Sequence, residues 1–453
     1  MTDSVGVYIS VPFCKAKCTY CNFASGVFGA GPSGSARMDR YVERVCVEIR
    51  GWAWPMGAKE TNPTIASSFG SAIMGHPAAR VDTIFFGGGT PSLLSAEQMR
   101  RLFEALRREF AVNADAEVTL ECAPGQLSEE TLDEMLRQGM NRVSFGVQSF
   151  VDAEAKAVGR LHTREVCLSE ITRMRAAGVE NINVDLIAGL PGQTAASWRE
   201  SVEVALGTGV PHVSVYMLEV DEDSRLGREI LGAGNSHPSE PRPLAGYPDR
   251  EQGIGNRLRY GADAVASEDE IAEWYGAACE WLEAGGVRQY EISNFARQCF
   301  ASRHNVKFWR REAYVGFGLD AHSMLRTGAG AVRWANSDDL EGYLGSEASG
   351  ARLQGSAALV QLGVSAGPEV EVIGNEKAFE EAMFLGLRMN DGVDLEALQA
   401  EFGAGLVRGA VEALGDVVEA GLVVVEGGRV RLTARGRMAS NEVFGRLLVG
   451  ATV

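Results

Sequence analysis

Residues 8 to 23 of the chain read Tyr8-Ile-Ser-Val-Pro-Phe-Cys-Lys-Ala-Lys-Cys-Thr-Tyr-Cys-Asn-Phe23. The stretch holds three cysteines, Cys14, Cys18 and Cys21, with three and then two residues between them. Thiolates at this spacing suit a cubane [4Fe-4S] cluster, and three thiolates for four irons leave one iron without a protein ligand. That open iron is able to chelate a small molecule through its amino and carboxylate groups. The stretch therefore predicts a site for a cluster and a second ligand.

Two other uses of the cysteines fit the sequence less well. A structural zinc takes a fourth Cys or His at close spacing, but the next cysteine is Cys46 and the first histidine is His76. Disulfides are typical of small secreted scaffolds, whereas this chain has eight cysteines in 453 residues and its first residues do not read as a signal peptide. We therefore expect reduced thiols and a cytoplasmic protein.

The composition is ordinary for a soluble globular protein, with 45% apolar and 23% charged residues, and the length suits two or three domains. The longest apolar runs, such as residues 422–425, are far shorter than the roughly 20 residues of a membrane span. A net charge of -17 argues against non-specific binding to nucleic acid, which rewards clustered Lys and Arg. We therefore expect neither a transmembrane segment nor a nucleic-acid partner.

The first half of the chain alternates short β-branched runs with amphipathic helical segments, which is typical of parallel βα units. A helix is predicted to begin at Ser95, because Ser95 and Gln98 fit a capping box. The six predicted strands span residues 7–11, 81–86, 117–121, 142–148, 182–187 and 212–219. This pattern predicts an α/β fold built on a partial (β/α)6 barrel.

The conspicuous residues of this region fall at the carboxyl ends of the predicted strands. Parallel barrels assemble their chemistry at that rim, whereas the opposite rim serves stability. The residues in question are the cysteine loop, the Gly87-Gly88-Gly89 turn, Glu121, Gln148 and Asp185. Five separate segments thus predict one site.

Composition and turn-forming residues indicate how the rest of the chain is organised. Segments near 51–80 and 231–266 mix Gly, Pro and Ala without periodicity and are predicted to be mobile insertions in a barrel domain of residues 1–330. A smaller, mainly helical C-terminal domain is predicted over residues 336–453, with a helix at 376–390 and a hairpin at 421–433 whose turn is Gly427-Gly428. Its helix–helix–hairpin order suggests a winged helix, but its helices carry as many carboxylates as bases, which argues against a nucleic-acid role.

A family resemblance extends well beyond the cysteines. It rests on Tyr8–Cys14 and on five further motifs: Phe86-Gly-Gly-Gly-Thr-Pro-Ser92, Arg142-Val-Ser-Phe-Gly-Val-Gln-Ser-Phe150, Gly159-Arg-Leu-His162, Asn183-Val-Asp-Leu-Ile-Ala-Gly-Leu-Pro-Gly-Gln193 and Tyr290-Glu-Ile-Ser-Asn-Phe295. In order and spacing they resemble the oxygen-independent coproporphyrinogen III oxidase family of the radical S-adenosylmethionine (SAM) superfamily. The likeness covers roughly residues 5 to 325, and the C-terminal segment is similar to that family's accessory domain.

Two positions favour one branch of that family. The oxidases resemble a Cys-x3-Cys-x2-Cys-x-Cys pattern, whereas this chain has Phe23 at the place of the fourth cysteine. The run His304-Asn-Val-Lys-Phe-Trp309 is similar to a His-Asn-x-x-Tyr-Trp motif of the other branch, the haem chaperones of HemW type, with Phe308 in place of the tyrosine. The resemblance therefore implies a protein that binds and hands over haem.

The resemblance also implies the cofactor sites. Cys14, Cys18 and Cys21 would hold the [4Fe-4S] cluster, with Tyr20 packed over the cluster or over a nucleoside. Arg160 is the natural counter-charge for the SAM carboxylate, because its fork can bind a carboxylate at two points. The full set of implied SAM contacts is Tyr8, Gly88, Gly89, Thr90, Glu121, Gln148, Arg160 and Asp185. Glu121 and Asp185 stand in apolar surroundings, so an internal ion pair is the alternative role for them.

For haem, His304 is the candidate axial ligand, because imidazole is the commonest proximal donor. Cys299 and His322 compete with it for the role. Phe308 and Trp309 could stack on a porphyrin face, although a plain hydrophobic cluster is an equally good explanation. These alternatives stay open at the level of sequence.

Three functions follow from this reading. The first is a haem chaperone that binds a cluster, SAM and haem and delivers haem to an acceptor protein, with an electron donor as a further partner and membrane contact only through the acceptor. The second is SAM-dependent oxidative decarboxylation of coproporphyrinogen III by a 5′-deoxyadenosyl radical. The third is a radical enzyme with an unrelated substrate. The sequence names no catalytic residue and leaves enzymatic activity undecided, with oxidase activity disfavoured by Phe23.

Overall fold

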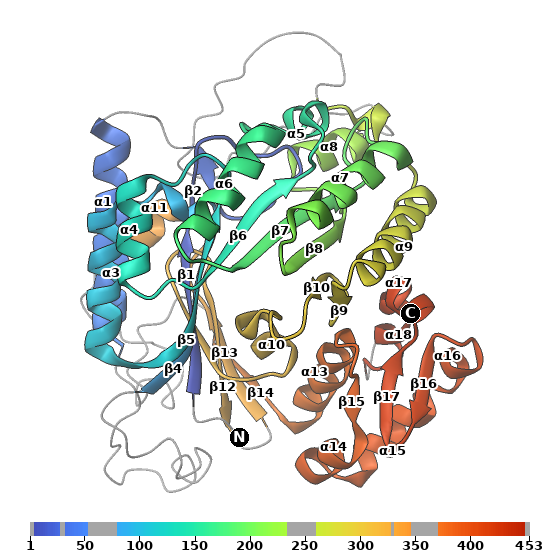
Figure 1. Ribbon diagram of the computed structural model, residues 1–453. Helices are drawn as coiled ribbons and strands as arrows, with labels where there is room; N and C mark the ends of the chain where they lie inside the picture. Colours follow the sequence, from blue (N-terminus) through green and yellow to red (C-terminus); the bar gives the residue numbers. More distant parts are fainter. Residues whose placement is uncertain are drawn as a thin grey trace, which may run out of the picture.

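The computed structural model describes residues 4–27, 32–52, 79–232, 260–327, 330–345 and 370–448. Its main feature is a 12-stranded sheet with the order β14-β13-β12-β11-β1-β4-β5-β6-β7-β8-β10-β9 (Figure 1). Most of the two predicted insertions lies outside the described residues. The structure assigns Ala79 and Arg80 to a strand and Leu231 and Gly232 to a helix, so the predicted insertion boundaries were too wide there.

The centre of the sheet consists of parallel strands that neighbour each other in chain order. They are β1 (Ser4–Val11), β4 (Ala79–Gly88), β5 (Phe110–Cys122), β6 (Arg142–Gln148), β7 (Asn181–Ala188) and β8 (His212–Met217). The helices α1 (Pro32–Arg50), α3 (Ala96–Glu109), α4 (Glu129–Arg137), α6 (Arg164–Ala176) and α7 (Ala195–Thr208) cover the outside of the sheet, and α5 (Asp152–Ala157) and α8 (Arg225–Gly232) lie near the carboxyl ends of the strands (Figure 1). The predicted α/β fold with a six-stranded parallel core is confirmed.

Local sequence explains why these elements form where they do. Ser95 caps α3 as predicted: its side chain accepts a hydrogen bond from the Gln98 backbone, and the Gln98 side chain accepts one from Ser95 N at 2.9 Å. Met99, Leu102, Phe103 and Leu106 of this helix are buried against the sheet. These buried side chains therefore hold α3, which lies between β4 and β5 in the chain, against the sheet.

Two groups of strands extend the parallel core and were missing from the sequence analysis. On one side lie β11 (Tyr314–Phe317), β12 (His322–Thr327), β13 (Gly330–Ala335) and β14 (Val370–Ile373); on the other lie β10 (Asn294–Ala296) and β9 (Arg288–Gln289), after helix α9 (Glu268–Ala284). β11 runs parallel to β1, and β10 runs antiparallel to β8. In sequence, the short helix α10 (Arg303–Trp309) lies between β10 and β11, and α11 (Leu340–Gly345) lies between β13 and β14.

The C-terminal region is mainly helical, with a hairpin. The expected helix is α13 (Asn375–Arg388), followed by α14 (Leu395–Phe402), α15 (Ala404–Ala413) and α16 (Gly415–Glu419). The hairpin pairs β16 (Val423–Glu426) with β17 (Arg429–Leu432), which also pairs with β15 (Val393–Asp394), and α17 (Ala434–Met438) and α18 (Ser440–Gly445) close the chain. Gly427 and Gly428 have φ of 58° and 75°, as a two-residue hairpin turn of this kind requires. No helix of the described ranges is long and apolar enough to cross a bilayer.

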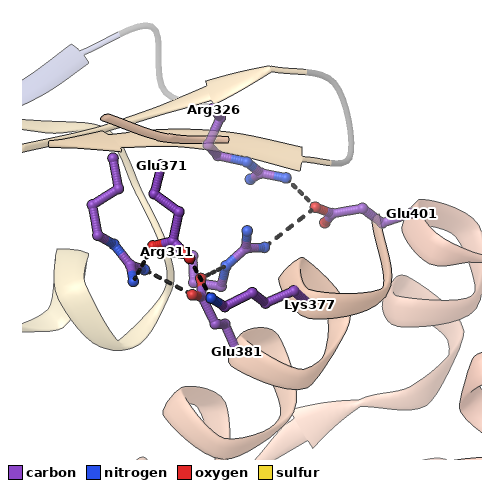
Figure 2. A network of polar contacts seen from close by, with 7 residues as sticks. Arg311, Arg326, Glu371, Lys377, Glu381 and Glu401 are labelled. Atoms are coloured by element: carbon purple, nitrogen blue, oxygen red, sulfur yellow. Dashed lines mark hydrogen bonds and ion pairs between the residues drawn. The ribbon is translucent and has the colours of Figure 1, made fainter. Parts of the chain in front are cut away.

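A network of charged side chains joins the C-terminal helices to the sheet (Figure 2). Glu381 of α13 is at its centre, with Arg311 Nε 3.4 Å and Arg333 Nη2 2.8 Å from its carboxylate oxygens. Glu401 of α14 pairs with Arg326 of β12 and lies 4.0 Å from Arg311 Nη1. Arg311 and Glu381 are both buried, so this part of the network holds charges that water does not reach.

Replacing Glu381 with alanine is expected to lower the free energy of unfolding by about 3 kcal/mol, because it leaves Arg311 buried without its main partner. The matched control is Glu371→Ala. Glu371 is 43% exposed and pairs with Lys377 in the same network, so its loss should cost less than about 1 kcal/mol. Chemical denaturation measures both values, and equal losses in the two variants would contradict the buried-pair explanation.

Candidate active site

The cysteine loop lies between two very short strands, β2 (Phe13–Cys14) and β3 (Gly26–Val27), which pair in parallel. Backbone hydrogen bonds fix it to other parts of the rim: Thr19 N donates to Val158 O at 3.2 Å, and Leu226 N donates to Thr19 O at 2.8 Å. The loop is therefore anchored to the end of α5 and to the start of α8.

Each of the three thiols has a different polar neighbour. Thr90 Oγ1 lies 3.6 Å from Cys14 Sγ, Arg160 Nη1 lies 3.3 Å from Cys18 Sγ, and Ser25 Oγ lies 3.9 Å from Cys21 Sγ. Burial raises the pKa of Cys14 and of Cys21; charge repulsion from Cys21 and Cys18 raises that of Cys14 further, and repulsion from Cys18 raises that of Cys21. Cluster binding would consequently release protons from the loop.

The donor set fits a cubane cluster. The part of the chain that the structure describes contains no group of three Cys, His, Asp or Glu side chains arranged around one metal position. A cubane does not need such an arrangement, because each of its three thiolates binds a different iron. Cys14, Cys18 and Cys21 remain partly exposed and unpaired by disulfides, so all three are free to serve as ligands.

The glycine turn lies directly against the cysteine loop. Gly89 N donates to Val11 O at 2.8 Å, and Thr90 N donates to Phe13 O at 2.7 Å. A Cβ on Gly89 would lie only 2.8 Å from Val11 O and 2.9 Å from Phe13 N, both of them backbone atoms. Gly88 has a φ of 100°, which a residue with a side chain rarely adopts. The turn thus holds the segment before Cys14 through backbone hydrogen bonds, and the Thr90 side chain adds its contact with Cys14 Sγ.

Arg160 lies next to the loop, and the side chains of Arg160 and Gln148 both approach Gly146. The Arg160 guanidinium donates to Gly146 O as well as contacting Cys18. Burial by itself would lower the pKa of Arg160, but the neighbouring Cys18 and Tyr20 hold that pKa above its ordinary value. Gln148 has a φ of 69°, and its Oε1 is buried without a hydrogen-bond partner among the described residues. Both side chains thus lie close to Gly146, and their contact with SAM stays a prediction.

Tyr20, between the second and third cysteines, points away from solvent. Its ring packs beside a small apolar cluster of Val158, Ile187 and Leu190. Burial and the adjacent Cys18 raise the pKa of its hydroxyl well above the ordinary value. The Tyr20 side chain therefore connects the cysteine loop to this apolar cluster.

The other predicted SAM residues, Tyr8, Glu121 and Asp185, line a polar cavity of about 230 Å³ inside the barrel, here called the interior cavity. Asp185 accepts hydrogen bonds from Asn183 Nδ2 at 2.7 Å and from Ser144 Oγ at 3.2 Å. Burial raises the pKa of Asp185, and it raises that of Glu121 to about 8, with repulsion from Asp185 adding to the effect. Among the described residues neither carboxyl group forms an ion pair with a cationic side chain, and the raised pKa of Glu121 favours its protonated form at neutral pH.

The sequence analysis missed several residues of the interior cavity, namely Phe85, Arg142, Ser144, Asn183, Ser214 and Tyr216. The alternation of side chains along the strands could have identified some of these residues. Side chains two residues apart point to the same face, so Arg142 and Ser144 face the same side of β6 and Asn183 lies on the face of Asp185. The cavity is built from these inward-facing positions of neighbouring strands.

The raised pKa of Glu121 predicts a particular dependence of stability on pH. The folded protein keeps a proton on Glu121 up to about pH 8, whereas the unfolded chain loses it near the ordinary value of 4.5. Between these limits the free energy of unfolding falls as pH rises, by up to about 1.4 kcal/mol per pH unit. Glu121→Gln should lack this slope and gain stability relative to wild type from about pH 5 to about pH 8.

Denaturation curves across this pH range check the prediction. The control is Glu97→Gln on α3, whose side chain is 61% exposed. Parallel pH profiles for wild type and Glu121→Gln would mean that Glu121 is ionised throughout.

A second cavity, of about 250 Å³, opens beside the cysteine loop and is here called the aromatic cavity. Its lining includes four aromatic rings, those of Tyr8, Phe23, Phe308 and Tyr314. Phe23 is 62% exposed, an unusual state for such a large apolar side chain. The rest of the lining consists of Ser10, Ala24, Gly88, Asp320 and His322, with His322 Nε2 3.7 Å from Asp320 Oδ1.

The candidate haem ligands are in very different surroundings. His304 is 1% exposed, its Nδ1 lies 2.8 Å from Thr83 Oγ1, and its ring stacks on Phe85 at 5.2 Å between centroids. Burial lowers the pKa of His304 to about 3, and its Nε2 faces the interior cavity without a partner. The side chain of His322, by contrast, is 58% exposed, and Cys299 is exposed away from both cavities.

Phe308 and Trp309 of the same helix point in different directions. Phe308 packs edge-on against Tyr314 at 4.5 Å between centroids and lines both cavities. Trp309 lies under the guanidinium of Arg388 at 4.3 Å and lines a separate pocket between α10 and the C-terminal helices. Of these two side chains, Phe308 is the one that lines the aromatic cavity and can contact a ligand there.

The chain is similar to known proteins over most of its length. The model of the radical SAM superfamily matches residues 8–205, and that of the HemN C-terminal domain matches residues 374–439. A Bacillus subtilis (strain 168) protein named heme chaperone HemW is 32% identical over 442 residues, which cover 97% of this chain and 98% of the relative. A Lactococcus lactis protein of the same name is 29% identical and covers 98% of this chain and 97% of the relative.

Among solved structures, the coproporphyrinogen III oxidase HemN of Escherichia coli, titled a radical SAM enzyme, superposes with a TM-score of 0.70. The match covers 98% of this chain and 90% of HemN, and at 19% identity it shows the shared fold. Membership of the superfamily implies a [4Fe-4S] cluster and SAM. By the extent and identity of its match to the Bacillus protein, the chain belongs to the HemW family of radical SAM proteins.

Proposed function

We propose that this protein is a haem chaperone, which binds haem beside a [4Fe-4S] cluster and SAM and passes the haem to an acceptor protein. The observation that carries the proposal is Phe23, which stands at the place of the fourth cysteine of the oxidases. It is exposed at the entrance of the aromatic cavity, next to the cluster loop. An apolar ring at this point favours the binding of a flat apolar ligand over the ligation of metal.

Different residues of the rim would bind the cluster and SAM. Cys14, Cys18 and Cys21 would hold the cluster, whose open iron provides a place for the amino and carboxylate groups of SAM. The backbone of Gly88 and Gly89 would receive the amino end of SAM, and Arg160, already beside Cys18, would neutralise negative charge there. Gln148 has an unsatisfied buried oxygen at the same rim and would accept a hydrogen bond from the bound SAM.

For the haem iron we infer that His322 is better placed than His304. His304 is 1% exposed, whereas the side chain of His322 is 58% exposed. His322 lies at the open side of the aromatic cavity, where the rings of Phe23 and Tyr314 can pack on a porphyrin face. We therefore propose His322 as the axial ligand in preference to His304, the candidate from the sequence, because His304 is buried.

The remaining parts of the proposal concern partners and domains. A haem-accepting protein, an electron donor for the cluster and a cytoplasmic location go with the proposed function. We further propose that the barrel with its insertions, residues 1–330, carries both sites, and that the accessory domain, residues 336–453, packs against it. The charged network around Glu381 supports this division, because it links helices of the second part to strands of the first.

Anaerobic turnover tests the proposal against the oxidase alternative. The cluster-reconstituted protein is incubated with coproporphyrinogen III, SAM and a reductant, and the porphyrinogen products are measured. We expect no protoporphyrinogen above the level of the Cys18→Ala variant. Protoporphyrinogen formed over many turnovers would overturn the chaperone assignment and make the protein an oxidase.

A further inference from the structure

A chain of hydrogen-bonded side chains connects the interior cavity to the start of helix α10. Its members are Asp185, Asn183, His212 and Tyr290, and it ends at Ser302, the N-cap residue of α10. Asp185 and Asn183 line the cavity, whereas His212 and Tyr290 are not part of its lining. His212 is fully buried and lies in register with Asn183 on the neighbouring strand. Two residues behind the cavity are thus linked to a carboxyl group inside it.

The contacts along this chain are short. Asn183 Nδ2 donates to Asp185 Oδ1 at 2.7 Å, and His212 Nδ1 lies 2.6 Å from Asn183 Oδ1. His212 Nε2 lies 3.0 Å from the hydroxyl of Tyr290, which also accepts a hydrogen bond from Ser302 N at 3.2 Å. All four distances are in or at the edge of the range of well-formed hydrogen bonds. Each side chain therefore contacts the next one directly.

The chain has one consistent direction of donation. A carboxylate only accepts hydrogen bonds, so Asp185 requires the amide nitrogen of Asn183 on its side. The amide oxygen then faces His212 and receives a proton from Nδ1. Burial and the charge of Arg142 hold the pKa of His212 well below its ordinary value, so the ring is neutral and has one proton to give. With this proton on Nδ1, Nε2 accepts a hydrogen bond from the Tyr290 hydroxyl.

Ser214 is the other donor close to the amide oxygen of Asn183. Its Oγ lies 3.2 Å from Asn183 Oδ1 but only 2.8 Å from Asn294 Oδ1. A serine hydroxyl has a single proton, and the shorter contact favours Asn294 for it. His212 is therefore the main donor that fixes the orientation of the Asn183 amide.

This orientation matters for the carboxyl group in the cavity. An amide that turns by 180° exchanges its oxygen and its nitrogen. If Asn183 turned in this way, its oxygen would face Asp185, and two acceptors would repel each other. In the structure Asn183 holds Oδ1 of Asp185, while Ser144 Oγ donates to Oδ2 at 3.2 Å. The carboxyl group is thus oriented before any ligand arrives, which is typical of a preorganised binding site.

We propose that His212 is a positioning residue for SAM: it fixes the amide of Asn183, which orients the carboxylate of Asp185 toward a hydrogen-bond donor of SAM. Tyr290 keeps the proton of His212 on Nδ1 and is the second positioning residue. This inference rests on the proposed binding of SAM, in which Asp185 is a predicted contact. It deepens that proposal, because it assigns a role to two residues that do not touch the ligand.

The first test measures the affinity for SAM by calorimetry, on cluster-reconstituted protein under anaerobic conditions and without a reductant, so that SAM is not cleaved. His212→Leu removes both ring nitrogens, whereas His212→Asn keeps an N–H donor close to the position of Nδ1. We expect His212→Leu to bind SAM about tenfold more weakly, the factor that one hydrogen bond to a charged group can supply. His212→Asn should bind within about threefold of wild type. Wild-type affinity in His212→Leu overturns the proposal.

A double-mutant cycle separates positioning from a merely structural role. Asp185→Ala alone should weaken SAM binding, and adding His212→Leu should then have no further effect, because the carboxylate on which His212 acts is gone. A structural role would weaken binding by the same factor in both backgrounds, and that result contradicts the proposal. So does wild-type affinity in Asp185→Ala, because it removes the predicted contact.

Tyr290→Phe tests the same chain if His212→Leu does not fold, as judged by circular dichroism and thermal unfolding. The matched control is Tyr275→Phe on α9, where the lost hydroxyl is also buried and donates to Ile292 O. We expect both variants to lose thermal stability, but only Tyr290→Phe to bind SAM severalfold more weakly. Equal SAM affinity in the two variants overturns the role of Tyr290 and of the chain behind Asp185.

Failure of this inference can be told apart from failure of the proposed function. Titration with haemin reports on the chaperone function without involving His212. A saturable Soret shift together with equal effects of His212→Leu in both backgrounds leaves the chaperone function standing and removes the positioning role. A His212 effect that vanishes in Asp185→Ala, without any haemin shift, does the reverse.

Discussion

The variant Cys18→Ala is expected to retain less than about a tenth of the iron and sulfide that the reconstituted wild-type protein binds. Cys18 is one of three thiolates that must each hold a separate iron, and two thiolates leave half of the cubane irons without a protein ligand. The loop itself should stay in place, because its anchors are backbone hydrogen bonds of Thr19 and not contacts of the Cys18 sulfur.

Iron and sulfide analysis with a circular dichroism spectrum measures this loss without relying on activity. Cys299→Ala and Cys46→Ala are the matched controls, since Cys299 is exposed elsewhere and Cys46 is a buried residue of α1. Both should bind as much iron as wild type. Full iron content in Cys18→Ala, or an equal loss in either control, would contradict the assignment of the cluster to the loop.

Gly89→Ala is expected to have the second largest effect. The added Cβ would lie within 3 Å of three backbone atoms, Val11 O, Phe13 N and Phe13 O, and backbone atoms cannot move aside as a flexible side chain can. Overpacking of this kind costs about 2 to 3 kcal/mol. Since Cys14 directly follows Phe13, we also expect cluster binding to fall severalfold.

The control is Gly409→Ala in α15, where a Cβ meets no heavy atom within 4 Å. An alanine in a helix is more favourable than a glycine by up to about 1 kcal/mol, so this variant should be slightly more stable than wild type. Chemical denaturation measures the stability of the two variants, and iron analysis measures how much cluster each one binds. A Gly89→Ala protein with wild-type stability and a full cluster would show that the turn does not position the loop.

The sequence predicted the parallel core well because its signals are local. The run from Arg142 to Gln148 alternates and is bounded by turns, and β6 has these same ends. The edge strands β9 to β14 escaped prediction for the opposite reason. β14 is only four residues long, and its place next to β13 depends on pairing with a distant part of the chain.

The site shows the same contrast. Motif residues such as Cys18, Arg160 and Gly89 lie together as the order of the strands predicts. The depth of each residue could not be read from the sequence, because it depends on how the strands align. His304 belongs to a motif and is nevertheless sealed in the interior, whereas His322 lies at an open cavity. Arg142 could have been found from the alternation of β6, but its lack of an ionic partner is visible only in three dimensions.

Titration of the cluster-reconstituted protein with haemin under anaerobic conditions tests the central claim most directly. The proposed chaperone function predicts a Soret shift that saturates at about one haemin per chain, and a band position that changes in His322→Ala but not in Cys299→Ala. A titration without a saturable shift would contradict haem binding and, with it, the proposed function of this protein.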